Sequence, residues 1–144
     1  MKLLLSTPCE KVLQDPDSGH SLIAVFHDIK IQISKDAEAP PNDAVVPQNW
    51  AVFSKFGLDH EEENKEYSLL TDIFWPDGKP FVSGNQLNAL PPTKNGMTFV
   101  VKLQGFPMGQ NGEVKVRQTL KCNGAIVFGP FESIVRINVE RTMN

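Results

Sequence analysis

Short runs in which apolar and polar residues alternate dominate this chain, with turn-forming residues between them. The clearest run is Glu113 to Cys122, whose valines and Leu120 share one face while its lysines and Arg117 share the other. A period of two is typical of a strand with one face in the core and one in water. Asn123-Gly124 follows at once, a pair favoured in type I′ hairpins because both positions need positive φ. The pattern predicts a hairpin that returns through Ala125 to Phe128.

The same alternation recurs along the chain and predicts about eight or nine strands in total. Further strands are expected over Lys2 to Leu13, His20 to Ile33, Asn49 to Phe56, Glu66 to Trp75, Lys79 to Leu90, Met97 to Gly105 and Ser133 to Glu140. Turn signals separate several of them, at Asp15 to Gly19, Asp77-Gly78 and Asn95-Gly96. Pro130 precedes the last run and predicts a bulge or a change of strand, because proline cannot donate to a ladder.

Two segments interrupt this rhythm without marking a domain boundary. Lys35 to Gln48 contains three prolines and predicts a long extended connection, and Leu58 to Lys65 predicts an acidic loop or a single helical turn. Strand patterns continue on both sides of each, so we expect one all-β domain over residues 1–144. Many short strands with turns between them indicate an antiparallel β-sandwich. A partly open β-barrel is the alternative, although the uneven connections favour a sandwich.

Composition narrows the class of partner. A chain of 144 residues with 40% hydrophobic and 22% charged residues is typical of a globular domain with its own core. The formal net charge of −3 lacks the basic excess of proteins that bind nucleic acid or anionic membranes. We find no run near 18 apolar residues, so no membrane span is expected. The three leucines after Lys2 are too few for an export signal, and we expect a cytoplasmic protein.

The two cysteines are too few for a disulfide scaffold. Cys9 and Cys122 each lie in a strand-like stretch, where a free cysteine behaves as a small buried hydrophobe. Reduced thiols are therefore expected, although sequence separation leaves a single bridge between the two open.

The charged and glycine-rich segments complete no catalytic, metal or cofactor motif. His60 lies among the acids of Asp59 to Glu63, but the second histidine of the zinc-protease pattern is missing, so we expect a solvated loop. His27-Asp28 is able to orient a base, yet no nucleophile motif accompanies it. The glycines at 105, 109 and 112 have neither dinucleotide nor phosphate-loop spacing. We therefore expect no catalytic residue, metal or cofactor; a hydrolase-type enzyme with dispersed His, Asp and Glu residues is the less favoured alternative.

Trp50 and Trp75 are the residues best suited to form a platform for a sugar ring. Trp75 stands at a strand end, but tryptophan is usually buried, so core or rim packing is the favoured interpretation for both. The weak candidates for ligand or partner contact are Trp50, Trp75, His60, Phe106, Met108 and Gln110. The leading hypothesis is a non-catalytic binding or protein-interaction module, with a protein partner or self-association through sheet edges. A carbohydrate-binding module with exposed Trp is the alternative.

The order of several segments also suggests a family. These are Ser21 to Phe26, the proline-rich link, Asn49 to Phe53, Trp75-Pro76-Asp77 and Gly105 to Glu113. Together they resemble a family of small bacterial proteins, a domain of unknown function, over nearly the whole chain. The resemblance implies a compact β-sandwich-like domain, and it implies no activity, cofactor or catalytic residue.

Overall fold

A computed structural model describes residues 1–14, 19–89 and 96–141, and nine strands account for most of them. The strands are β1 (Lys2–Gln14), β2 (His20–Val25), β3 (Asp28–Ile33), β4 (Val45–Gly57), β5 (Tyr67–Phe74), β6 (Pro80–Asn88), β7 (Met97–Pro107), β8 (Gly112–Cys122) and β9 (Ala125–Arg141). One 3-10 turn, η1 (His60–Glu62), lies in the acidic segment where a loop or single helical turn is expected. The turn predicted at Asp15 to Gly19 falls almost entirely outside the described residues, as do Leu90 and Asn95.

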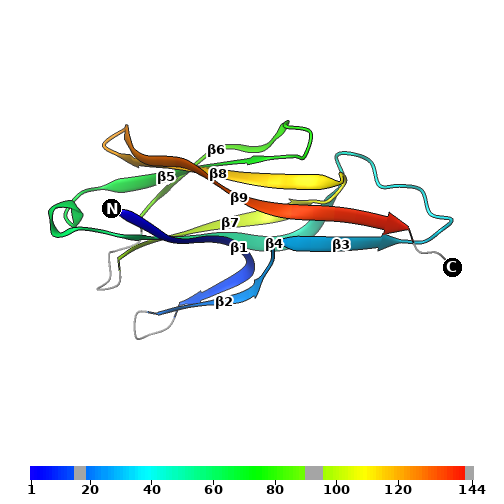
Figure 1. The fold of residues 1–144 in the computed structure, drawn as a ribbon, viewed down its shortest axis with the longest axis horizontal. Coiled ribbons are helices and arrows are strands. Elements are labelled where there is room, and N and C mark those ends of the chain that lie inside the picture. The colour runs from blue at the N-terminus through cyan, green and yellow to red at the C-terminus, as the bar shows by residue number, and fades with distance from the viewer. Residues whose placement is uncertain (15–18, 90–95, 142–144) are drawn as a thin grey trace.

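The strands form two facing sheets, so the β-sandwich prediction is confirmed and the barrel alternative is wrong. Sheet A has the order β2-β1-β4-β7 and sheet B the order β3-β9-β8-β5-β6 (Figure 1). Neighbouring strands are antiparallel except for β3, which pairs in parallel with the end of β9. That exception was not predicted, because β3 and β9 are separated by most of the chain.

The core lies between the sheets and consists of the inward-facing alternate residues of both. The largest fully buried side chains in it include Trp50, Phe56, Phe99, Phe106, Leu69, Ile73 and Leu120. On β8, Val114, Val116 and Leu120 are 0% exposed, which confirms the face assigned to that strand. Phe56 packs edge-on against Phe99, with ring centroids 6.0 Å apart.

A polar bridge crosses this apolar core and ties the sheets together. Gln118 of β8 accepts hydrogen bonds at Oε1 from the hydroxyls of Ser54 (2.7 Å) and Ser6 (3.0 Å) in sheet A. Its Nε2 donates to Thr71 Oγ1 of β5 (3.1 Å). Gln118 is 1% exposed and Ser54 and Thr71 are 0% exposed, so each needs these partners.

The β8–β9 hairpin forms as predicted. Asn123 and Gly124 have φ values of 52° and 81°, the left-handed region that the turn requires. Further along, β9 opposes Gln118 with Phe131 but Leu120 with Phe128, so one extra residue bulges around Pro130. The expected bulge is confirmed, and β9 runs through it as one strand.

The second half of β1 leaves the plane of sheet A. Through Cys9, β1 pairs with β4; beyond it, the strand pairs with β2 alone. Figure 1 shows this hairpin doubling back outside sheet A. The hairpin, residues 10–14 and 20–25, is called the arm here. It covers the outer face of β4, where the ring of His20 packs 5.3 Å from that of Phe53, which is only 4% exposed.

The arm contains a strained residue whose replacement should stabilise the protein. Ala24 has a φ of 54°, a conformation that costs an L-residue with a Cβ roughly 1–2 kcal/mol. We expect Ala24→Gly to raise the free energy of unfolding by about 1 kcal/mol, measured by urea denaturation. Ala125→Gly is the matched control at an exposed strand position, where glycine should instead cost about 0.5–1 kcal/mol. Equal effects of the two changes would contradict the strain at Ala24.

Candidate functional site

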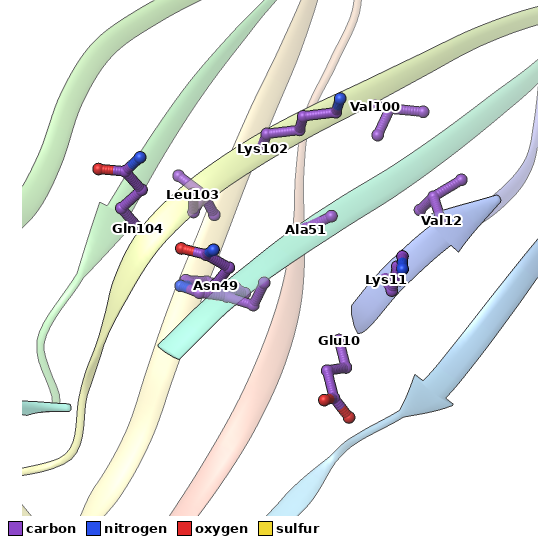
Figure 2. A pocket seen from close by; sticks show the side chains of 10 residues that line it. Glu10, Lys11, Val12, Asn49, Ala51, Val100, Lys102, Leu103 and Gln104 are labelled. Carbon is purple, nitrogen blue, oxygen red and sulfur yellow. The ribbon is translucent and has the colours of Figure 1, made fainter. Parts of the chain in front are cut away.

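A hollow lies on the outer face of sheet A, between the arm and strands β4 and β7. Its volume is about 430 Å³, within the size range of small-molecule sites. It is lined by Glu10, Lys11, Val12, Asn49, Trp50, Ala51, Val100, Lys102, Leu103 and Gln104. In Figure 2 the arm residues stand on one side, Lys102 and Val100 on the other, and Ala51 between them. We call this feature the arm hollow.

Strand alternation explains which side chains reach the arm hollow. Ala51 pairs with Cys9 on one side and with Lys102 on the other, so all three belong to the outer face of sheet A, where Ala51 and Lys102 line the hollow and Cys9 does not. Ala51 has only a methyl group on this face and leaves a gap. Phe53, the next residue of β4 on the same face, fills the space beneath the arm. Cys9 is 0% exposed, and burial raises the pKa of its thiol. The thiol is therefore protonated at neutral pH and poorly suited to act as a nucleophile.

The charges around the arm hollow do not cancel. Lys11 and Lys102 are exposed, and Glu10 is the acid beside them. In the described part of the chain, the ion pairs have the Met1 amine, His60, Arg117 or Arg136 as the cation. Both lysines of the hollow are thus without a carboxylate partner among those residues. A surplus positive charge therefore faces this hollow on a protein whose net charge is −3.

The second feature is the free edge of β7, directly beside the arm hollow. From Met97 to Gln104, β7 pairs with β4 without a register shift. Within residues 1–14, 19–89 and 96–141, no strand pairs with its other side. Alternate backbone N–H and C=O groups along that side are therefore free to bond with another polypeptide.

The remaining sheet edges are shorter or interrupted. β6 begins at Pro80 and shows two register shifts against β5. β2 has six residues and includes the left-handed Ala24, and β3 has six residues that include Asp28 and Lys30. Prolines, bulges and charges are common means of blocking strand addition. β7 is therefore the most regular free edge of the described structure.

A second hollow, of about 390 Å³, lies at the end of the sandwich where β5 finishes. Gln110 holds it together: Nε2 donates to the Asn42 carbonyl (3.1 Å) and to Asp77 Oδ2 (3.2 Å), and Oε1 accepts from the Asp77 amide (3.1 Å). Nearby, Met108 is half-buried and packs against the core. These bonds use both ends of the Gln110 amide, so its role is to join loops.

The tryptophans are core residues, which is the interpretation favoured from sequence. Trp50 is 2% exposed, donates from Nε1 to the Gly105 carbonyl (2.8 Å), and packs against Phe106, whose centroid is 4.9 Å away. Trp75 is 9% exposed and packs edge-on against Phe81. The carbohydrate-binding alternative depends on an exposed indole, and neither tryptophan has one.

His60 and the His27-Asp28 pair lie at opposite ends of the sandwich. The His60 side chain is 97% exposed, with Nδ1 3.4 Å from Glu63 Oε2, in the 3-10 turn η1 that precedes β5. In the register of sheet B, Asp28 of β3 lies beside Arg136 of β9, and Arg136 lies beside Glu113 of β8. Tyr67, the first residue of β5 after η1, lies beside Cys122 at the other end of β8. The stretch of β8 between those two positions spans roughly 30 Å. The dispersed residues of the hydrolase alternative are thus not brought together.

Both cysteines of the chain lie in the described part and are unpaired, as expected. Among the described residues, no group of three or more His, Cys, Asp or Glu side chains is placed to hold a metal ion. Across the same residues, we find no helix long and apolar enough to cross a membrane.

Comparison with known proteins adds no assignment. Neither a scan of protein-family models nor a search of curated protein sequences found a match to this chain. The resemblance to a family of small bacterial proteins therefore stays a prediction.

The sequence patterns do not predict the arm hollow or the free edge of β7. Lys11 and Lys102 are 91 positions apart in the numbering, and nothing in either local pattern indicates that β1 doubles back to bring them to one hollow. The strand over Met97 to Gly105 was predicted, but its place at a sheet edge was not. Strand order depends on long-range pairing, for which alternation gives no signal.

Proposed function

We propose that this protein is a non-catalytic protein-interaction module that pairs with another polypeptide strand along the free edge of β7. A second copy of the chain is the proposed partner, in keeping with the prevalence of twofold homodimers. Strand addition supplies affinity through main-chain hydrogen bonds and does not require a cofactor. A cytoplasmic location is part of the same proposal.

The observation that carries this proposal is the unbroken register of β7 from Met97 to Gln104 beside an unpaired edge. Lys102 is the single charged residue in that stretch, so two antiparallel copies meet with little charge repulsion. The protonated, buried Cys9 and the separation of His60 from the His27-Asp28 pair favour binding over catalysis.

Self-association should therefore protect β7 in a concentration-dependent way. We expect light scattering to show a dimer as the protein concentration rises to about 500 μM, in the micromolar-to-millimolar range of weak association. Hydrogen exchange should show added protection at alternate amides of Met97 to Gln104, because alternate residues point their N–H groups to the free edge.

The β6 edge serves as the internal control, since Pro80 and its register shifts make it a poor template. Its amides should keep the same exchange rates at all concentrations. A strictly monomeric protein with unchanged β7 exchange, and no partner retained in a pull-down, would argue against the proposal.

A further inference from the structure

We propose that the arm hollow binds a small amphipathic organic anion, such as an aromatic carboxylate. The inference is independent of strand pairing at β7, because it concerns the outer face of sheet A and not its edge. It rests on the shape, the lining and the charge of the hollow.

The floor and one wall of the arm hollow suit an apolar group. Ala51 contributes a methyl group at the floor, and the half-buried Val12 and Val100 face the hollow from opposite sides (Figure 2). With a volume of about 430 Å³, the hollow has room for a bicyclic ring system. Covering these side chains with an apolar ligand removes their surface from water, which is favourable.

The rim supplies positive charge and hydrogen-bond donors. Lys11 and Lys102 stand on opposite sides of the hollow, and neither has an ion-pair partner within the described chain. Figure 2 places the Glu10 carboxylate on the far side from Lys102, so it does not neutralise that amine. The exposed amide of Asn49 adds a neutral donor at the end of the hollow. An anionic group on an apolar body matches this arrangement, and a cation does not.

The lining also indicates binding without reaction. It includes no histidine, cysteine, serine, threonine or tyrosine among the described residues that form it. Glu10 and the two lysines are its titratable groups, and they stand on the rim. We therefore expect a ligand that is held and released unchanged.

Titration with 2-naphthoate tests this site, and 2-naphthamide is the matched uncharged probe. Followed by ¹H–¹⁵N NMR, naphthoate should shift the amides of Val12, Ala51 and Val100 in a saturable way. Naphthamide should bind at least about threefold more weakly, because it lacks the charge that the lysines attract. Lys102→Gln and Lys11→Gln should each weaken naphthoate binding by about threefold, and neither should change naphthamide binding.

Lys115→Gln is the control, since Lys115 is an exposed lysine on the outer face of sheet B. That variant should bind both probes as the wild type does. Equal affinity for the acid and the amide, no change on removal of either arm-hollow lysine, or shifts centred on other exposed apolar residues such as Ile126 would each overturn the proposal. Because Lys11 and Lys102 are exposed, these variants should retain the fold, and their spectra will show it.

Discussion

Replacing Gln118 with leucine should lower the free energy of unfolding by about 2–4 kcal/mol, although leucine is apolar and similar in size. The loss of stability arises because the buried hydroxyls that bond Gln118 lose their hydrogen bonds to it, and not from the removal of the glutamine itself. Ser54 and Thr71 are fully buried, and without the Gln118 amide their hydroxyls lose hydrogen bonds of 2.7 and 3.1 Å. Ser6 is half-buried and able to reach water more easily. Urea denaturation followed by circular dichroism measures the change.

A compensated variant separates this explanation from a simple packing defect. Gln118→Leu combined with Ser54→Ala and Thr71→Val removes the two fully buried hydroxyls that bond Gln118 and leaves an apolar contact between the sheets. We expect most of the lost stability to return, to within about 1 kcal/mol of the wild type. A triple variant less stable than the single one would show that hydroxyls left without the Gln118 amide are not the cause of the loss.

Trp50→Ala should cost about 3–5 kcal/mol, the range found when a large aromatic side chain is removed from a core. Trp50 fills the inner face of β4, with its ring centroid 4.9 Å from that of Phe106 and 6.2 Å from that of Phe26. Its indole N–H also satisfies the carbonyl of Gly105, whose φ of 81° turns the backbone at the end of β7. The midpoint of urea unfolding should fall accordingly.

Two further variants test the origin of that loss. Trp50→Phe keeps an aromatic ring and loses the hydrogen bond to Gly105, so it should cost about half as much as alanine. Ile126→Ala, at a side chain that is 62% exposed, should change stability by less than about 0.5 kcal/mol. A mild effect of Trp50→Ala would reopen a surface role for this residue, and with it the carbohydrate-binding alternative.

Local sequence patterns predicted the strands well where each strand has one buried and one exposed face. The face assigned to β8 and the turn at Asn123-Gly124 are both found in the structure. The bulge at Pro130 followed from the missing N–H of proline. The tryptophans were correctly favoured as core residues, since the size and apolar area of the indole make burial its usual state.

The candidate site was less accessible to prediction. Phe106, Met108 and Gln110 lie close together in the sequence and are all candidates for ligand or partner contact, but the structure gives them different roles. Phe106 is in the core, Met108 packs at its margin, and Gln110 joins three loops by hydrogen bonds. Residues that are close in sequence point in different directions when a strand continues beyond its predicted end. β7 does so by two residues, to Pro107.

Alternation and turn chemistry are local properties of the backbone, so the sequence predicts an all-β protein and the buried face of strands such as β8. The run His20 to Ile33, expected as one strand, is divided between β2 of sheet A and β3 of sheet B. Only the tertiary structure decided that β1 bends after Cys9, that Lys11 and Lys102 flank one hollow, and that β7 ends sheet A. These features depend on which distant strands pair, and that choice is made by the packing of whole faces against each other. The arm hollow and the β7 edge are therefore products of strand order, for which short motifs carry no signal.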